Sequence, residues 1–200
     1  MEIYLVRHTT PEVTKGVCYG QTDLDAAKTF VAEANIIKAH LPENIQHIYS
    51  SPLQRCTKLA AHLFPEKNIQ LHNDLMEINC GIWEMQRWDD IPKNDIAPWM
   101  KDFVNVRMPQ GENYTDLFER VCGAFRSIAA NPLPAVVVAH GGVIRSILSY
   151  ITNTSLIDSF NVFTLHYGCV IKIEMTVGNM QHHILSNIGH EKETHKPSNL

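Results

Sequence analysis

The 200-residue sequence lacks the features that define several classes of protein. Its cysteines number only five and never form a Cys-x-x-Cys pair, which excludes a disulfide framework or zinc-finger spacing and predicts reduced thiols. The densest apolar run, residues 135–139, is far shorter than a membrane span, and the N-terminal apolar run is too short for a signal peptide. We therefore expect a cytoplasmic protein without a membrane partner.

Charge of either sign is also scarce. The 17 Lys and Arg residues against 21 Asp and Glu residues give a net charge of −4, and charged residues make up 19% of the chain. This balance offers no basic field for nucleic acid, while a hydrophobic content of 44% excludes a disordered chain. The length suits one domain. What the chain does contain is eleven histidines, whose purpose its composition does not reveal.

Segments with strand periodicity alternate with segments of helical periodicity. Short apolar runs predict strands over residues 2–6, 45–49, 69–71, 135–139, 171–175 and 180–186. Apolar spacing predicts helices from residue 25 to 41, from Pro52 after a Ser51 cap, over 117–128, and from Gly141 onward. The alternation predicts an α/β protein: a three-layer α/β/α sandwich with a mostly parallel sheet and helices on both faces.

Two regions fall outside this alternation. Residues 85–113 contain three of the ten prolines, and we interpret them as a lid or subdomain inserted into a single domain of residues 1–188. Arg87, Trp88 and Trp99 in this insertion are candidates to contact a substrate. Residues 189–200 are polar and are expected to form a flexible C-terminal tail.

The residues that follow the predicted strands carry the candidate chemistry, because ligands of open α/β sheets bind at the carboxyl ends of strands. Arg7 and His8 follow the first strand, and Arg55 lies in the helix after the second. Glu77 lies downstream of the third strand, and His140 follows the fourth. Each alone is more simply an edge pair, a solvated side chain or a loop contact. Together they predict that one rim of the sheet gathers two arginines, two histidines and a carboxylate.

Such a cluster suits a phosphoryl group. Two guanidinium groups match its oxygens, and helix N-termini after Ser51 and at Gly141 would add N–H groups with positive dipole ends. A neutral imidazole beside these cations is a capable nucleophile, and a carboxyl group such as Glu77 can protonate a leaving alcohol. The residues therefore favour covalent phosphoryl transfer to His8.

Several segments resemble the signatures of the histidine phosphatase (phosphoglycerate-mutase-like) superfamily. They are residues 5–8 (LVRH), 50–57 (SSPLQRCT) and 139–145 (AHGGVIR). Residues 76–84 (MEINCGIWE) resemble its general-acid segment, and residues 111–114 (GENY) resemble its Gly-Glu-Ser element. These segments lie within residues 3–150 in the expected order.

The resemblance implies a role for each matched residue. His8 would carry the phosphoryl group. The pocket around it would be formed by Arg7, Arg55 and His140. Glu77 would protonate the leaving group and then activate water. No metal and no organic cofactor are implied, since Arg and His supply the charge, and the partner is a small phosphorylated substrate.

The substrate-binding loops match the family less closely. The resemblance adds the Gly141 N–H to the phosphate pocket, and Gly20 and Gln21 are candidate substrate contacts. Residues 9–14 (TTPEVT) depart from the Gly, acidic residue and Ser/Thr that many members carry after the Arg-His pair. The Arg-His-Thr-x-Pro opening, with residues 18–20 (CYG), is similar to the α-ribazole phosphatase branch of cobalamin lower-ligand assembly. The predicted substrate is therefore α-ribazole 5′-phosphate.

Alternatives stay open: a broad-specificity small-molecule phosphatase, a phosphoglycerate mutase, or a phospho-ligand-binding module without catalysis. Gly142 stands where mutases of the family commonly carry Asn, which favours a phosphatase. No cysteine is followed six residues later by Arg, which excludes a cysteine phosphatase. Residues 23–25 (DLD) follow no apolar run, so we expect a helix cap there rather than an aspartyl phosphatase. The sequence predicts no oligomeric state.

Overall fold

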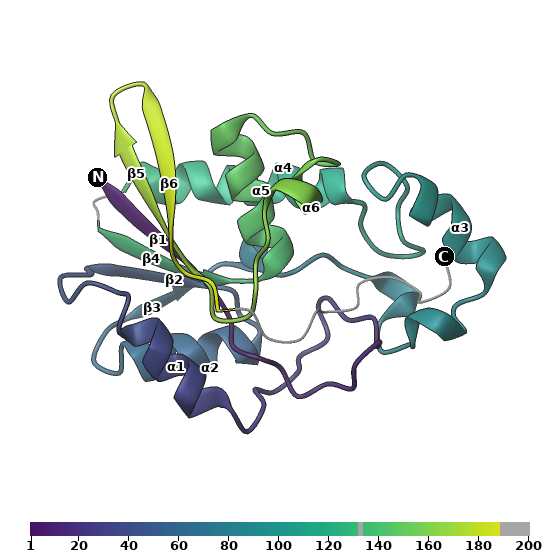
Figure 1. Cartoon of the computed structure of the whole chain (residues 1–200), viewed down its shortest axis with the longest axis horizontal. Helices are drawn as coiled ribbons and strands as arrows, with labels where there is room; N and C mark the ends of the chain where they lie inside the picture. The colour runs from purple at the N-terminus through teal and green to yellow at the C-terminus, as the bar shows by residue number, and fades with distance from the viewer. Residues whose placement is uncertain (132–133, 189–200) are drawn as a thin grey trace.

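A six-stranded sheet runs through the centre of the computed structural model, which describes residues 1–131 and 134–188 (Figure 1). The strands are β1 (Glu2–Arg7), β2 (His47–Ser50), β3 (Ile69–Leu71), β4 (Ala135–Ala139), β5 (Val170–Thr176) and β6 (Asn179–Ser186). Their order is β3-β2-β4-β1-β5-β6; the first four pair in parallel, and β5 and β6 run antiparallel. The predicted strands are confirmed. The predicted tail, residues 189–200, lies outside the described residues.

Helices cover both faces of this sheet (Figure 1). In the part of the chain that the structure describes, the helices are α1 (Phe30–Lys38), α2 (Gln54–Leu63), α3 (Lys93–Lys101), α4 (Tyr114–Ala129), α5 (Gly141–Thr152) and α6 (Ser159–Val162), of which α3 lies away from the sheet (Figure 1). Because side chains of a strand alternate between faces, Val136 and Val138 pack with the α1 and α2 side, whereas Val137 packs with α4 and α5. The three-layer α/β/α architecture is therefore confirmed. None of the helices in the described ranges has the length and apolar character needed to cross a membrane.

Two helix starts differ from the sequence predictions. The helix expected from residue 25 begins at Phe30, because residues 25–27 lie extended against the loop after β1: Glu12 N–H donates to the Asp25 carbonyl and Ala27 N–H to the Thr10 carbonyl. Val31, expected on the buried face, is 56% exposed. The prediction of a helix that starts at Pro52 with Ser51 as its cap is also wrong, because α2 begins at Gln54 with Leu53 at the N-cap position.

The N-terminus of α2 is capped by a residue that lies far away in the sequence. The Asp23 carboxylate accepts the N–H of Gln54, the first residue of α2, at 2.7 Å. Asp23 stands 31 residues earlier in the chain, so no local pattern pairs it with Gln54. Residues 23–25 therefore do provide a helix cap, as expected, and the helix that Asp23 caps is α2.

Residues 85–113 pack around a small apolar cluster that they share with neighbouring segments of the chain. Its buried members are Cys18, Cys80, Trp83, Trp88, Ile91, Ile96 and Met108. The Trp88 ring stacks on that of Trp99, with centroids 5.6 Å apart. Trp88 therefore packs inside the cluster rather than presenting its indole ring to a substrate, whereas Arg87 is exposed.

Candidate active site

The carboxyl ends of β1, β2 and β4 bring the candidate residues to one edge of the sheet. His8 N–H donates to the Ala139 carbonyl and Ser51 N–H to the Val138 carbonyl, both at 3.0 Å, so the chain segments that leave these strands lie side by side. Four predicted site residues are buried there. They are Arg7, His8, Arg55 and His140. Burial of four ionisable side chains at one edge marks this cluster as the candidate site.

The Thr9 carbonyl selects one tautomer of the neutral His8 ring. Its Nδ1 lies 2.7 Å from the Thr9 carbonyl oxygen, which can only accept a hydrogen bond. Nδ1 therefore carries the proton, and Nε2 carries the lone pair. The imidazole ring of His140 lies edge-on to that of His8, with centroids 5.1 Å apart. The arrangement suits nucleophilic attack by His8 Nε2.

His140 is kept neutral by its surroundings. Burial lowers its pKa well below the ordinary value, and the positive charges of Arg55 and Arg7 lower it further, as does that of His8 when the His8 ring is protonated. Its Nε2 lies 2.8 Å from the hydroxyl oxygen of Ser51. A neutral His140 can donate a hydrogen bond to a phosphate oxygen without giving up its proton.

Arg7 lies between an aromatic ring and the start of α5. Its guanidinium carbon is 4.2 Å from the centroid of the Tyr167 ring, and its Nη1 donates to the Leu165 carbonyl at 2.5 Å. A Cβ at Gly141 would lie 3.2 Å from the same guanidinium carbon. Glycine at this position therefore allows Arg7 to approach the first N–H of α5, which has no partner within the helix.

Arg55 is fixed by two backbone carbonyls. Its Nη2 donates to the Gly20 carbonyl at 2.6 Å, and its Nη1 donates to the Thr22 carbonyl at 2.8 Å. Its Nε is buried and has no hydrogen-bond partner among the described residues. A buried donor on a guanidinium group is suited to an anionic oxygen, as the resemblance to phosphatases implies.

Glu77 reaches the same helix start from the other side. Its two carboxylate oxygens accept the N–H groups of Ile78 and Gly142, each at 2.9 Å. A Cβ at Gly142 would lie only 2.3 Å from the Glu77 carboxylate oxygen Oε1. The structure therefore brings Glu77 to the helix that begins directly after His140.

Groups at three predicted phosphate or substrate contacts form hydrogen bonds within the protein. The N-terminus of α2 does not offer its first N–H to a phosphate, because Asp23 accepts it. The Gly20 carbonyl accepts a hydrogen bond from Arg55, and the Gly20 N–H donates to Glu84 at 3.0 Å. Gln21 donates its side-chain amide to the Glu77 carbonyl at 3.0 Å. In this structure Gly20 and Gln21 thus hold Arg55 and Glu77 in place.

Glu84 is a site residue that the sequence reasoning missed. Its carboxylate accepts the N–H groups of Gly20, Gln21, Thr22 and Cys80, together with the Thr22 hydroxyl. Burial alone would raise the pKa of Glu84, but these hydrogen bonds lower it overall. Because Gly20 and Glu84 are 64 residues apart, only the end of the 76–84 signature could have pointed to Glu84.

Tyr19 and Tyr167 were also missed. Their hydroxyl oxygens lie 2.5 Å apart, and their rings lie against Arg55 and Arg7 respectively. The pair therefore links the loop before Gly20 to the loop before β5 beside both guanidinium groups.

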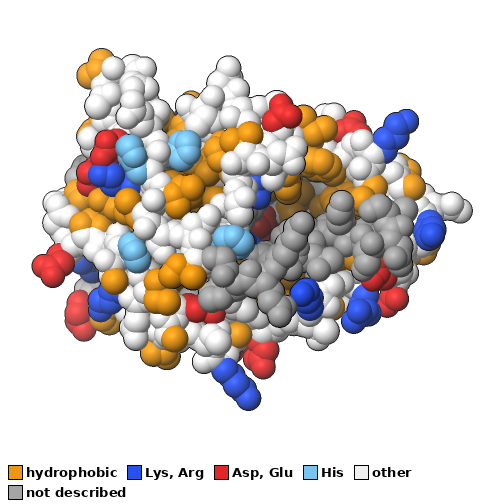
Figure 2. All heavy atoms as spheres, in the orientation of Figure 1, with side chains coloured by type: hydrophobic (Ala, Val, Ile, Leu, Met, Phe, Trp, Pro, Cys, Tyr) orange, Lys and Arg blue, Asp and Glu red, His pale blue; other side chains and the backbone are white. Residues whose placement is uncertain are grey.

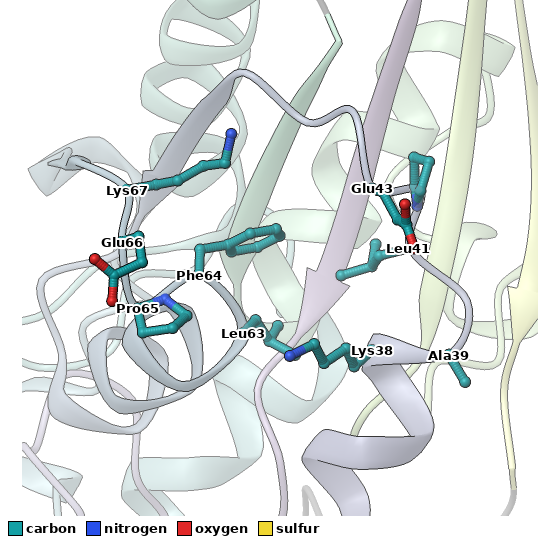
Figure 3. A pocket seen from close by; sticks show the side chains of 10 residues that line it. Lys38, Ala39, Leu41, Glu43, Leu63, Phe64, Pro65, Glu66 and Lys67 are labelled. Atoms are coloured by element: carbon teal, nitrogen blue, oxygen red, sulfur yellow. The ribbon is translucent and has the colours of Figure 1, made fainter.

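A hollow on the surface lies away from this cluster. It has a volume of about 500 Å³ and is lined by the C-terminal ends of α1 and α2 and the residues that follow them, including Lys38, Leu41, Phe64 and Lys67 (Figure 3). None of the predicted site residues lines it. The candidate site is therefore defined by its buried polar side chains and not by this hollow.

Comparisons with known proteins agree with the arrangement. A family model described as the histidine phosphatase superfamily (branch 1) matches residues 3–187. A 6-phosphofructo-2-kinase/fructose-2,6-bisphosphatase of Arabidopsis thaliana is 26% identical over 163 residues, which are 78% of this chain but 22% of that protein. A Hydrogenobacter thermophilus protein named for phosphoserine phosphatase activity is 27% identical over 168 residues, 80% of this chain and 83% of that protein.

A solved structure extends the comparison to the fold. The alpha-ribazole phosphatase from Shigella flexneri superposes with a TM-score of 0.85, covering 96% of this chain and 100% of that one. The two sequences are 19% identical, so this likeness concerns the fold alone.

Proposed function

This chain belongs to the histidine phosphatase superfamily (branch 1), and from that premise we propose that it hydrolyses phosphomonoesters through a phosphohistidine intermediate on His8. The observation that carries the proposal is the bond between His8 Nδ1 and the Thr9 carbonyl, because it leaves the lone pair on Nε2 within a cluster of cations. The resemblance of the site segments to the family supports the same role.

The first chemical step forms a bond between His8 Nε2 and phosphorus. The bond from phosphorus to the alcohol oxygen breaks, and protonated Glu77 gives its proton to that oxygen. Charge on the remaining phosphoryl oxygens is balanced by Arg7 and Arg55, with hydrogen bonds from neutral His140 and the Gly141 N–H.

The second step releases phosphate. The Glu77 carboxylate takes a proton from water, the water oxygen bonds to phosphorus, and the bond to His8 Nε2 breaks. The product is orthophosphate, and Glu77 is protonated again for the next cycle. Since the two arginines supply the positive charge, we propose that no metal ion takes part.

For the substrate we propose α-ribazole 5′-phosphate, in the cytoplasm. The support is the sequence of the loop after β1 and of residues 18–20, which resembles that branch of the family. The likeness of fold to the Shigella flexneri enzyme is compatible with this choice. A substrate panel tests it: α-ribazole 5′-phosphate should have a higher kcat/KM than 3-phosphoglycerate, sugar phosphates or phosphopeptides. A marked preference for another member would remove this substrate and leave the mechanism intact.

The activity itself is tested with 4-nitrophenyl phosphate in the presence of EDTA. Wild-type protein should hydrolyse it, His8→Ala should lose turnover, and His183→Ala, at a half-exposed histidine of β6, should keep it. Inhibition by EDTA would contradict the metal-free mechanism. Tight phosphate binding without any turnover would favour a phospho-ligand-binding module, and isomerisation of 3-phosphoglycerate without hydrolysis would favour a mutase.

A further inference from the structure

Glu77 lies on a segment with little regular structure to hold it. Residues 76–80 belong to no helix or strand; they connect two single turns, η1 (Asn73–Leu75) and η2 (Gly81–Trp83). The position of the Glu77 carboxyl group therefore depends on what the carbonyl and N–H groups of this segment contact. A proton donor must come within hydrogen-bond distance of the leaving oxygen, so these contacts bear directly on catalysis.

One side chain collects the carbonyls of this segment. Arg120, on α4, donates from Nη1 to the carbonyls of Asp74 and Met76, at 2.9 and 2.7 Å. Its Nη2 donates to the carbonyl of Glu77 itself at 2.9 Å. The guanidinium group thus holds the backbone of the proton donor and the backbone just before it.

Arg120 is itself held by Glu112, at the end of the insertion. Its Nε and Nη2 donate to the two carboxylate oxygens of Glu112, each at 2.8 Å. Glu112 also accepts the N–H of Asn79 at 2.9 Å, and its own N–H donates to the Asn79 carbonyl at 2.8 Å. The two side chains are 17% and 19% exposed, so water screens the pair only partly.

The hydrogen bonds of Arg120 account for all of its donors. An arginine has five N–H groups, and the five acceptors named above take one each. None remains for a substrate oxygen, so Arg120 does not act as a third phosphate ligand. A lysine would keep the charge, but it has only three donors and no planar fork.

We propose that Arg120, fixed by Glu112, is a positioning residue that holds the Glu77 carboxyl group where it protonates the leaving oxygen. The proposal rests on the proposed function, since it assigns Arg120 to the acid step of that reaction. It also gives a role to Glu112 in the Gly-Glu-Asn-Tyr segment, which the site chemistry above does not use.

The proposal predicts a dependence on the leaving group. A 4-nitrophenolate leaves without a proton, whereas a phenolate without the nitro group leaves much better when it is protonated. Loss of Glu77 positioning should therefore reduce kcat/KM for phenyl phosphate far more than for 4-nitrophenyl phosphate. Because kcat/KM reports the steps up to release of the alcohol, the later role of Glu77 as a base does not enter.

The experiment measures kcat/KM for both substrates in wild type, Arg120→Lys, Arg120→Met, Glu112→Gln and Glu77→Gln. Arg126→Met is the matched control, because Arg126 is an exposed arginine on the same helix. Loss of folded protein lowers both rate constants equally and cancels from their ratio. A weakly folded variant therefore still gives an answer.

We expect the ratio of 4-nitrophenyl to phenyl phosphate kcat/KM to rise about tenfold or more in both Arg120 variants, in the direction of Glu77→Gln. Glu112→Gln should shift it in the same direction and Arg126→Met should not. The double variant Arg120→Lys/Glu77→Gln should show no further rise over Glu77→Gln. Equal losses for both substrates in the Arg120 variants, or no loss, would overturn the positioning role. Absence of turnover by wild type would instead overturn the proposed function.

Discussion

At the residue scale, the burial of His140 makes the stability of the protein depend on pH. Its imidazole ring is fully buried beside Arg55 and Arg7, and its pKa lies well below the ordinary 6.5. In the unfolded chain the same histidine binds a proton as the pH falls through that value. Below this pH the unfolded state binds a proton that the folded state does not bind. The contribution of His140 to the free energy of unfolding is therefore fully present above pH 6.5 and decreases as the pH falls below that value.

The first prediction follows from that sign. The free energy of unfolding should fall as the pH drops below 6.5, with His140 contributing up to about 1.4 kcal/mol per pH unit. In His140→Gln that part of the slope should disappear. Urea unfolding of both proteins at several pH values measures the difference. Identical slopes in the two proteins would show that His140 does not titrate in this way.

Glu84 is the second residue whose replacement is informative. Both of its carboxylate oxygens accept N–H groups, so the amide of Glu84→Gln would place its own N–H donors against them. We predict a loss of about 2 kcal/mol in the free energy of unfolding and weaker phosphate binding, because Gly20 and Thr22 hold Arg55. Chemical unfolding and phosphate titration measure both. The exposed Glu66→Gln should change neither; a stable Glu84→Gln variant with normal phosphate affinity would contradict this role.

At the element scale, the start of α5 couples a helix to the proton donor. Gly142 is the second residue of the helix, where an alanine would ordinarily stabilise by about 1 kcal/mol. Here the added Cβ would meet the Glu77 carboxylate and the side chain of Leu117. The carboxylate is the end of a flexible side chain, so it is displaced while the helix remains intact.

The third prediction compares two glycines in helices. Gly142→Ala should leave the free energy of unfolding within about 1 kcal/mol of wild type yet lower kcat/KM for phenyl phosphate about tenfold or more. Gly123→Ala on α4 should stabilise by about 1 kcal/mol with unchanged kinetics, because nothing lies within 4 Å of its added Cβ. Thermal unfolding and steady-state kinetics measure both variants. Full activity of Gly142→Ala would show that Glu77 need not lie where the structure places it.

The same elements show what the sequence could and could not predict. Strand β4 was predictable because residues 135–139 are buried on both faces, so that a continuous apolar run marks the strand without distant information. Helix α4 begins at Tyr114, earlier than its apolar spacing, because Asn113 and Asp116 form a capping box. The segments carrying Arg7, His8, Arg55 and His140 were predictable from their places after strands. The roles of Glu84 and Arg120 were not predictable. Apart from near neighbours in the sequence, the hydrogen-bond partners of Glu84 lie 62 to 64 residues away and those of Arg120 lie 43 to 46 residues away.

At the scale of the whole molecule, a net charge of −4 accompanies a proposed anionic substrate. Acidic and basic side chains are scattered over the face shown in Figure 2 and do not form a continuous field of one sign. The positive charge that matters is buried, in Arg7 and Arg55. Binding should therefore depend on local contacts more than on the overall charge.

The fourth prediction tests this pocket through global stability. If the site binds orthophosphate only in the folded chain, as we propose, a concentration 100 times its Kd should stabilise wild type by about 2.7 kcal/mol. Arg55→Lys should lose most of this gain, because lysine lacks the planar fork. Lys67→Met, at the hollow of Figure 3, should retain it. Thermal unfolding with and without phosphate measures the effect; equal stabilisation of Arg55→Lys would place the bound phosphate elsewhere.

We propose that His8 carries a phosphoryl group during turnover, and the most direct test is to trap this phosphohistidine. Protein turning over a radiolabelled phosphomonoester is denatured in base, and the labelled peptide is identified by mass spectrometry. We predict a label on His8 that is stable in base and lost in acid, with more of it in Glu77→Gln because water is no longer activated. Continued turnover by His8→Ala, or turnover by wild type with no label on His8, would contradict the account.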